Sequence, residues 1–270
     1  MTYSDADPQL IRKDIPQSAR IWSYWMGGKD YYEIDRIVGD ECREIYPDIT
    51  AIARQSQQFL ARTVTYLTAE AGVRQFIDIG CGLPALYNTH AIAQAIAPES
   101  GIVYVDHEPL VLTHARAMLT SSPEGFTCPL DVDFHDTEQM LADATNILDF
   151  SKPIAVLFVG VLGYARSYPD AAKIVRTTTT ALPAGSYLGL WDGTDNHPDH
   201  TRMWDFYNQT GAVNYTPSTR DQICGYFDGL ELEDPGVVAI NQWRPPVTDL
   251  GRTPQPLPAY GALARISPHP

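Results

Sequence analysis

The sequence predicts an α/β protein with a mostly parallel, seven-stranded sheet, helices on both faces of that sheet and an N-terminal helical cap. Two observations carry this prediction. Residues 1–72 show helical periodicity without a strand-like run, and from Val73 onward short apolar runs alternate with helical patterns. Repeated strand–helix units close a parallel sheet through right-handed crossovers. We expect one domain, in which residues 1–72 form the cap and residues 73–270 form the core.

The composition is that of a folded, acidic protein. The chain has 270 residues, enough to bury a sizeable core, and 44% of them are hydrophobic. Its 33 acidic residues outnumber its 19 Lys and Arg residues, so the formal net charge is −14. Such a surface repels phosphate backbones and no block of Lys or Arg interrupts it, so we expect no nucleic-acid partner.

The cysteines indicate a reduced protein. Cys42, Cys81, Cys128 and Cys224 are widely scattered and form no C-x-x-C pair. That spacing favours neither a zinc site nor a disulfide framework, and reduced thiols in a cytoplasmic protein are the expected state. Residues 1–14 contain no apolar stretch typical of a secretion signal. No apolar run approaches the ~18 residues of a membrane span, so we expect no membrane association.

The N-terminal part is predicted to be helical after a polar arm at residues 1–15. A short helix follows at 16–26, and Gly27 and Gly28 end it, because one of them suits the left-handed conformation of a helix end. The apolar residues of the next segments recur at helical spacing, which indicates a layer that packs onto the sheet. These two further helices are expected at 33–45 and 48–71.

The core is expected to alternate strands with helices. The Pro-rich segment at 243–258 cannot join a sheet interior and is predicted to be a surface loop. The strands are expected at 75–79, 102–106, 126–130, 154–160, 186–191, 229–233 and 259–266. The helices are expected at 85–97, 108–119, 136–146, 169–182, 198–210 and 218–227.

The segment at 75–84 predicts a ligand site at the carboxyl end of the first strand. A buried apolar strand leads into a turn containing Gly80 and Gly82, which permit tight bending and close approach of a ligand. Pro84 suits the first turn of a following helix, because its missing N–H would have no partner there. The pattern also satisfies the loose dinucleotide motif G-x-G-x-x-G/A, ending at Ala85, so an NAD site stays open.

Acidic residues end the neighbouring strands. Asp106 ends the second strand, where a carboxylate can accept hydrogen bonds from both ribose hydroxyls of a nucleoside or cap the helix near Glu108. Asp133 follows the third strand, where it can accept from an adenine amino group beside the Phe134 backbone N–H, or cap the next helix. Asp78 either holds the turn or meets a cationic ligand end. Acids at these positions favour a nucleoside over a pyrophosphate, which they would repel.

Seven short motifs carry a family resemblance: Ser18-Ala19-Arg20, Gly27-Gly28-Lys29-Asp30, Asp78-Ile79-Gly80-Cys81-Gly82-Leu83-Pro84, Val103-Tyr104-Val105-Asp106, Asp131-Val132-Asp133, Ala181-Leu182-Pro183-Ala184-Gly185-Ser186-Tyr187 and Phe227-Asp228-Gly229-Leu230. With these motifs the chain resembles class I S-adenosylmethionine (SAM)-dependent methyltransferases, which have a Rossmann-like fold. More specifically, it resembles an actinobacterial SAM-dependent methyltransferase family described as a domain of unknown function. The resemblance covers nearly the whole chain, with departures at Cys81, at Trp25-Met26 and at 159–164.

The resemblance implies that residues 73–270 form a SAM-binding core. Asp106 would bind the ribose, and Asp133 would bind the adenine together with its neighbour. Arg20 would pair with the carboxylate of SAM, or it is an exposed helix charge. Tyr24 would belong to an aromatic wall around the sulfonium, or it packs the cap. The implied cofactor-binding residues are Arg20, Tyr24, Lys29, Asp78, Gly80, Gly82, Asp106, His107, Asp133, Phe134 and Gly160.

The predicted activity is SAM-dependent methyl transfer to a small molecule by in-line displacement. Proximity, alignment and exclusion of water suffice for this reaction unless the nucleophile arrives protonated. Tyr164, Asp192 and His197 follow strands four and five and are the candidates for catalysis, with His197 as a base. The polar loop at 191–200 is otherwise an ordinary solvated loop or a divalent-cation site. The solvated loop is favoured, and we predict no metal site.

Two other functions stay open from the sequence. A SAM-binding regulatory protein without a methyl acceptor would explain the divergent loops after the fourth strand. An NAD(P)-dependent oxidoreductase would explain the glycine motif, although the glycine turn comes late in the chain and Pro84 follows it. The sequence names neither the methyl acceptor nor the oligomeric state.

Overall fold

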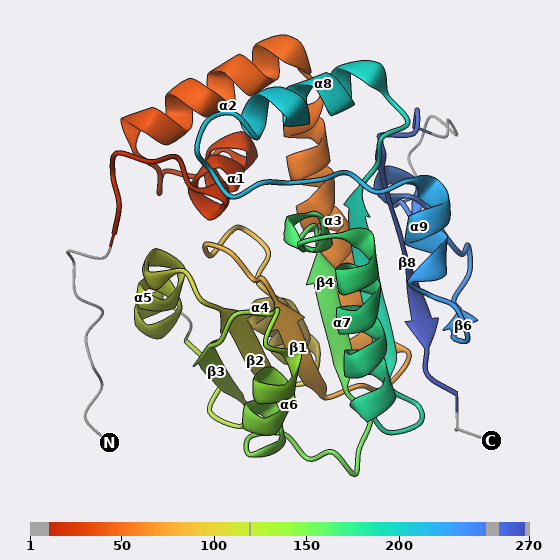
Figure 1. The fold of residues 1–270 in the computed structure, drawn as a ribbon. Coiled ribbons are helices and arrows are strands. Elements are labelled where there is room, and N and C mark those ends of the chain that lie inside the picture. Colours follow the sequence, from red (N-terminus) through yellow and green to blue (C-terminus); the bar gives the residue numbers. More distant parts are fainter. Residues whose placement is uncertain (1–10, 119, 247–253, 268–270) are drawn as a thin grey trace.

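The computed structural model describes residues 11–118, 120–246 and 254–267 (Figure 1). The polar arm expected at 1–15 falls mostly outside these residues, as does the middle of the loop expected at 243–258. One sheet runs through the molecule and helices cover both of its faces, so the predicted α/β class is confirmed.

The described residues form a sheet of eight strands in the order β3-β2-β1-β4-β5-β8-β6, and β7 pairs with β8. Strands β1 to β5 are parallel, whereas β8 is antiparallel to β5, β6 and β7. The predicted number of seven is therefore one too few, because β7 has only two residues and too little pattern to be recognised. The strands are β1 Gln75–Ile79, β2 Gly101–Asp106, β3 Phe126–Asp131, β4 Ala155–Val159, β5 Tyr187–Gly193, β6 Glu231–Leu232, β7 Val238–Ala239 and β8 Ala259–Arg265.

The helices of the described residues lie where the sequence predicts them, with small shifts at their ends. Their bounds are α1 Ser18–Met26, α2 Glu33–Ile45, α3 Ile49–Ala69, α4 Thr89–Ile96, α5 Pro109–Met118, α6 Thr137–Thr145, α7 Tyr168–Ala181, α8 Pro198–Tyr207 and α9 Arg220–Gly225. The described part of the chain also has the short 3-10 turns η2 Leu162–Tyr164 and η3 Ile240–Gln242.

The largest helix shift concerns α4, which begins at Thr89 rather than near residue 85. The Asn88 side chain accepts a hydrogen bond from the Ala85 N–H and donates one to the Ala85 carbonyl, so this segment closes a turn of its own. The prediction that Pro84 lies in the first helical turn is therefore wrong. Pro84 belongs to the loop that leads away from the glycine turn.

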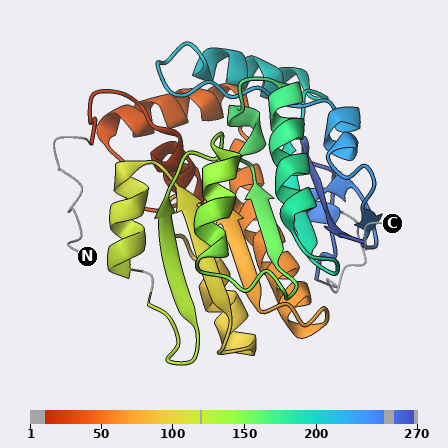
Figure 2. The same cartoon turned by 60° about the horizontal axis from the view of Figure 1, so that its bottom comes forward.

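The strands are buried on both faces because helices pack on each side. Phe76 and Ile102 belong to a core cluster that includes residues of α3 and α4, whereas Ile77 and Val103 belong to a cluster with α6 and α7 (Figure 2). Successive side chains of a strand point to opposite faces. A strand covered on both faces therefore needs a continuous apolar run, which is the pattern that reveals these strands in the sequence.

The cap lies over the carboxyl ends of the parallel strands (Figure 1). Helices α1 and α2 pack together, and α8 packs against α2 from the second half of the chain. The buried rings of Trp25 and Trp204 meet edge to face, 6.2 Å apart, and join α1 to α8. The described cap therefore includes α8 in addition to the N-terminal helices.

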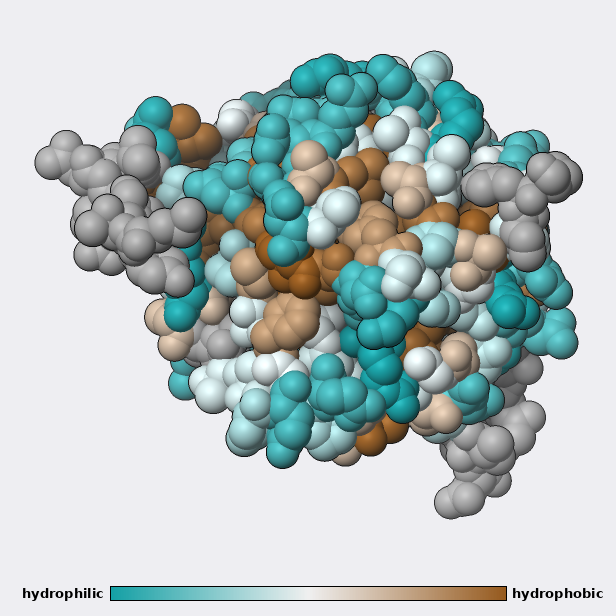
Figure 3. Space-filling view, turned by 90° about the horizontal axis from the view of Figure 1, so that it is seen from below, coloured by the Kyte–Doolittle hydropathy of each residue, from teal (hydrophilic) through white to brown (hydrophobic). Residues whose placement is uncertain are grey.

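The surface away from the cap is mixed in character. Viewed from below, hydrophilic residues cover its margins and apolar residues reach the surface near its middle (Figure 3). Within the described part of the chain, no helix combines the length and the apolar character needed to cross a membrane.

Candidate functional site

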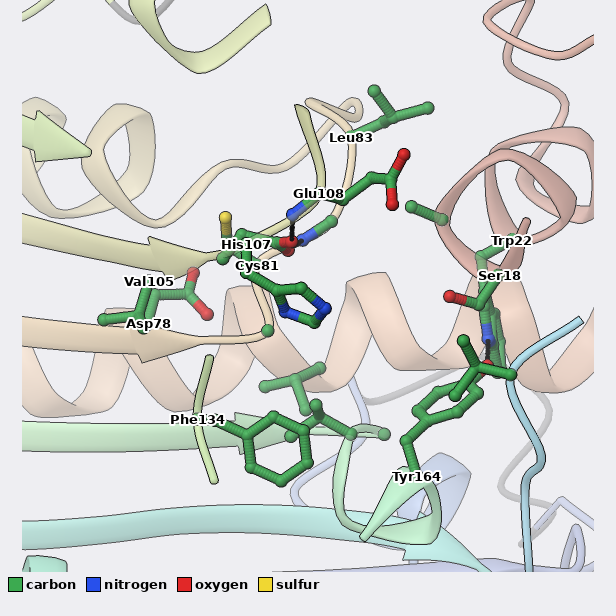
Figure 4. A pocket seen from close by; sticks show the side chains of 18 of the residues that line it. Ser18, Trp22, Asp78, Cys81, Leu83, Val105, His107, Glu108, Phe134 and Tyr164 are labelled. Carbon is green, nitrogen blue, oxygen red and sulfur yellow. Dashed lines mark hydrogen bonds between the residues drawn. The ribbon is translucent and has the colours of Figure 1, made fainter. Parts of the chain in front are cut away.

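A cavity of about 290 Å³ lies where the carboxyl ends of β1 to β4 meet the cap. Its volume is near the lower end of the range of small-molecule sites, roughly 300–1,000 Å³. Figure 4 shows Trp22, Ser18 and Tyr164 on one side of this cavity, across from Asp78 and His107. Ligands of parallel α/β sheets bind at this edge, where the strand order reverses on either side of β1.

The glycine turn after β1 is held in place by β2. The N–H groups of Gly80 and Cys81 donate to the Val105 carbonyl, at 2.9 and 3.4 Å. Gly80 has a φ of 65°, and a Cβ there would lie 2.3 Å from the Val161 side chain. Gly82 has a φ of 64°, but a Cβ there would meet nothing within 4 Å. Glycine is thus needed at the first position for packing, whereas the second leaves open space beside the cavity.

Asp106 joins the end of β2 to the glycine turn. Its Oδ2 accepts a hydrogen bond from the Gly82 N–H at 3.1 Å, and its Oδ1 accepts one from the Glu108 N–H at 2.9 Å. Burial raises the pKa of Asp106, and these backbone hydrogen bonds act in the opposite direction. Both predicted roles are therefore compatible in space, because the carboxyl holds the helix start and also lines the cavity.

Asp133 and Phe134 line the cavity after β3. Asp133 Oδ1 accepts from the backbone N–H of His135 at 3.0 Å and lies 2.7 Å from its ring Nδ1. Burial alone would raise the pKa of Asp133, but these contacts with His135 bring it below its ordinary value. Asp136, rather than Asp133, caps α6 by accepting from Gln139. Asp133 is therefore left at the cavity.

Asp78 is 5% exposed and accepts a hydrogen bond from the Thr89 hydroxyl at 2.6 Å. It therefore ties β1 to the start of α4 and also lines the cavity. Burial raises its pKa to about 6. A cationic group nearby would favour the ionised carboxylate and bring this pKa down.

The charges that line the cavity are acidic. Among the described residues, four carboxyl groups and two histidines line it, and no Lys or Arg does. Burial raises the pKa of Glu108, as it does for Asp78 and Asp106. A ligand with a net positive charge fits this set of groups, whereas a pyrophosphate would meet like charge without a cation to compensate it.

Three predicted cofactor ligands from the cap do not line the cavity: Arg20, Tyr24 and Lys29. The buried Arg20 guanidinium pairs with Asp35 at 2.7 Å and donates to two backbone carbonyls. The Tyr24 hydroxyl donates to Asp40, and Lys29 is exposed. Arg20 thus neither pairs with the carboxylate of SAM nor is an exposed helix charge, because the buried Asp35 requires its positive partner.

Of the three catalytic candidates, only Tyr164 lines the cavity. Asp192 is fully buried and accepts hydrogen bonds from the Gly163 N–H, the Gly193 N–H and the Tyr215 hydroxyl. Burial raises the pKa of Asp192 to about 6. His197 is exposed at the start of α8, where its ring contacts Tyr46.

Gly160, at the end of β4, also lines the cavity, as predicted residues Gly80, Gly82, His107 and Phe134 do. A Cβ at Gly160 would lie 2.7 Å from the Trp191 ring, so only glycine lets the backbone pass this close to the indole. Its φ of 71° also lies in the left-handed region that favours glycine.

The sequence reasoning missed the cavity residues of α1. Ser18, Trp22 and Met26 all line the cavity and stand four residues apart, so they share one face of the helix. Arg20 is buried on the opposite face of the helix, where it pairs with Asp35. The spacing of four was the available signal, and the predicted ligands Arg20 and Tyr24 lie on the other face of this helix. His135, Trp191 and Val213 were also missed.

No cluster of three or more His, Cys, Asp or Glu side chains that could hold a metal ion occurs among the described residues.

Comparisons with solved structures first define the class of fold. Human N-acetylserotonin methyltransferase, solved in complex with SAM, is 13% identical, with a TM-score of 0.50 over 92% of this chain and 70% of its own. At this identity the likeness shows the fold alone. A DUF574 family protein from Streptomyces avermitilis is 35% identical, with a TM-score of 0.86 over 94% of this chain and 98% of its own. A candidate methyltransferase from Thermobifida fusca is 32% identical, with a TM-score of 0.87 over 97% and 98%.

The chain belongs to the S-adenosyl methyltransferase family, whose model matches residues 4–267. No protein of curated function matches it. The family resemblance predicted from the sequence is confirmed, and so are the class I methyltransferase fold and SAM as the cofactor. The protein is a SAM-dependent methyltransferase, and the comparisons give no support to a regulatory protein or an NAD(P)-dependent oxidoreductase.

Proposed function

We propose that SAM binds in the cavity at the ends of β1 to β4, and that the acceptor is a small molecule that reaches the same cavity from the side of α1 and η2. The observation that carries this proposal is the charge of the cavity, which has four carboxyl groups and no Lys or Arg among its lining residues. SAM has a net positive charge, so it suits this lining. A dinucleotide with its pyrophosphate does not.

In this proposal each strand end binds a different part of the cofactor. Asp106 accepts hydrogen bonds from the ribose, while Asp133 and Phe134 hold the adenine. The glycine turn and Gly160 leave room for the backbone to border the ligand, and Asp78 and His107 complete this side. Arg20, Tyr24 and Lys29 have no such role, because their side chains are engaged elsewhere or exposed.

SAM, when bound, would supply a methyl group on a positively charged sulfur: a lone pair of the acceptor would form the new bond to this carbon while the carbon–sulfur bond breaks and leaves its electron pair on the sulfur. The residues of the chain position the acceptor and exclude water. Burial raises the pKa of Tyr164 to about 12, so its phenol keeps its proton and serves as a hydrogen-bond donor rather than a base. Asp192 positions η2, which carries Tyr164, by accepting the Gly163 N–H.

The proposed cofactor site also gives different roles to the cap and the core of the chain. Residues 73–270 supply the strand ends that hold the cofactor, and residues 1–72 supply the cap whose helix α1 covers the cavity. Because α8 packs on α2, the two parts fold as one domain with a shared cap.

The test is calorimetry of purified protein with S-adenosylhomocysteine and, separately, NAD⁺. We expect binding of the first and none of the second. Asp106→Asn should weaken S-adenosylhomocysteine binding about 10- to 100-fold, because it removes a charged hydrogen-bond acceptor worth about 1.5–3 kcal/mol.

Asp131→Asn is the matched control, since Asp131 pairs with Asp106 in the sheet but is exposed and does not line the cavity. It should leave the affinity unchanged. Absence of S-adenosylhomocysteine binding by the wild-type protein would contradict the cofactor site. Equal effects of the two variants would contradict the role of Asp106.

A further inference from the structure

We propose that the methyl acceptor is an uncharged molecule with a flat, apolar ring; this inference rests on the function proposed above. It would bind against the part of the cavity formed by Ser18, Trp22, Met26, Tyr164, Trp191 and Val213, which we name the acceptor wall.

Most of the charged groups that line the cavity lie in one half of it. Asp78, Asp106, His107 and Asp133 come from the ends of β1, β2 and β3, on the side where the ribose and adenine would lie. The acceptor wall comes from α1, η2, β5 and the segment after α8, and none of its side chains is charged. The acceptor wall itself is thus neutral.

Among the lining residues, Glu108 is the charged group that reaches α1. It interacts with Gln17, at the residue that precedes the helix, and burial raises its pKa. Trp22 lies a turn further along the helix and belongs to the neutral part. An ionic acceptor beside Trp22 and Tyr164 would lose its hydration without a partner of opposite charge in the wall, which disfavours both anions and cations.

The rings of the wall have fixed orientations. The Trp22 indole N–H donates to the Tyr164 hydroxyl at 3.1 Å, although these residues are far apart in the sequence. The Trp22 and Trp191 rings meet edge to face at 6.1 Å, with an interplanar angle of 72°. Trp191 is buried, so its ring gives the Trp22 ring a fixed contact. Aromatic surfaces that are already oriented bind flat apolar molecules with little loss of side-chain entropy.

Apolar side chains are also exposed at the cavity and on a neighbouring loop. Val213 lines the cavity and is 60% exposed, so it belongs both to the wall and to the surface. Leu86 and Tyr87 are exposed on the loop between β1 and α4, and Tyr87 lines a small hollow that shares Leu83 and Leu60 with the cavity. Exposed apolar residues beside a cavity favour an apolar ligand at its opening.

The experiment measures binding of four matched probes to protein saturated with S-adenosylhomocysteine. Methyl 4-hydroxybenzoate is the neutral aromatic probe, 4-hydroxybenzoate the anion and tyramine the cation, and methyl 4-hydroxycyclohexanecarboxylate is neutral but saturated. We expect the neutral aromatic probe to bind about tenfold or more tighter than either charged probe. It should also bind more tightly than the saturated one, because only an aromatic ring meets the indole with its π-face.

Two exposed positions provide a matched pair of variants. Val213→Lys places a positive charge at the wall, whereas Leu232→Lys places one on β6, outside the cavity lining. The first should weaken methyl 4-hydroxybenzoate and tighten 4-hydroxybenzoate, so that their ratio shifts about tenfold. The second should leave the ratio unchanged. Because both residues are exposed, neither variant removes core packing.

The outcomes separate the inference from the function on which it rests. If S-adenosylhomocysteine does not bind, the proposed cofactor site fails. If it binds but the charged or the saturated probe binds as well as the neutral aromatic one, or if no probe binds, the inference is overturned while the cofactor site stands. An equal effect of both lysine variants would also overturn it.

Discussion

Gly72 and Gly82 have nearly the same backbone conformation but different surroundings. Their φ angles are 71° and 64°, and a Cβ at either would meet nothing within 4 Å. Gly72 is exposed after α3, whereas Gly82 lines the cavity and donates to Asp106. Substitutions at these two glycines therefore distinguish the effect of backbone strain from the effect of lost space for the ligand.

Alanine at each of these glycines should lower the free energy of unfolding by about 1–2 kcal/mol, because both require the left-handed region. Gly82→Ala should in addition weaken S-adenosylhomocysteine binding by about tenfold or more, since its methyl group would enter the open space beside the cavity. Gly72→Ala should leave the affinity intact. Urea unfolding and calorimetry measure the two effects, and equal affinities would show that Gly82 does not border the ligand.

Asp78 predicts a pH dependence of cofactor binding. With its pKa raised to about 6 by burial, it is protonated in the free protein below that pH, whereas a cationic ligand favours the carboxylate. Affinity for SAM should therefore rise between about pH 5 and about pH 7 and then level off. Asp78→Asn should flatten the profile. An unchanged profile in this variant would assign the titration to another group.

The same shift acts on stability with a defined sign. The unfolded carboxyl has a pKa near 3.8, so between that value and about 6 the native state holds a proton that the unfolded state has lost. The free energy of unfolding should fall as the pH rises through this interval, and Asp78→Asn should remove this contribution. Urea unfolding of both proteins across the interval would measure it.

At the scale of elements, the buried pair of Arg20 and Asp35 fixes α1 against α2. The two side chains are 1% and 0% exposed, and Asp35 also accepts from the backbone N–H groups of Gln17 and Tyr32. Gln17 itself lines the cavity. The ion pair thus positions the start of α1, although its charged groups stay away from the ligand.

Arg20→Met should lower the free energy of unfolding by about 3–5 kcal/mol, because it leaves Asp35 buried without a partner. Arg202→Met, at the exposed pair with Asp199, should lower it by about 1 kcal/mol or less. The double variant Arg20→Met/Asp35→Leu should recover part of the loss. Denaturant unfolding provides the comparison, and a loss of similar size in both single variants would rule out the special role of the buried pair.

The elements that the sequence predicts well are those with a long, simple pattern. Strands β1, β2, β4 and β5 are mainly apolar because both faces are covered, and α3 repeats its apolar residues over 21 residues. The start of α4 could not be predicted because the turn of Ala85 and Asn88 depends on a side-chain hydrogen bond. The two residues of β7 hold no periodicity and depend on pairing with β8.

The candidate site likewise has features that the sequence predicts and features that only the folded structure reveals. The glycine turn and Asp106 follow two strands that pair in parallel, and the carboxyl ends of such strands meet at one edge of the sheet, so their positions at the cavity could be predicted from the chain order. The partner of Arg20 could not be foreseen, because Asp35 is brought to it by the packing of two helices. The contact of Trp22 with Tyr164 likewise joins the cap to the end of β4 and exists only in the folded molecule.

At the scale of the whole molecule, the net charge of −14 should favour the approach of a cationic cofactor. Affinity for SAM should fall as KCl is raised from about 0.05 M to about 0.5 M, because the Debye length shortens from roughly 14 to 4 Å in this interval. S-adenosylhomocysteine, which lacks the sulfonium charge, should respond less. Calorimetry at several salt concentrations measures both slopes, and parallel slopes would argue against long-range attraction.

Strand β8 follows every other strand of the sheet in the chain, yet it lies between β5 and β6. During synthesis on the ribosome, the elements that carry the cofactor site emerge first, and β5 has one unpaired side until Ala259–Arg265 arrives. An unpaired edge is a template for association with another chain. The nascent protein therefore passes through an interval in which its ligand site can assemble while its sheet still needs protection from neighbouring chains.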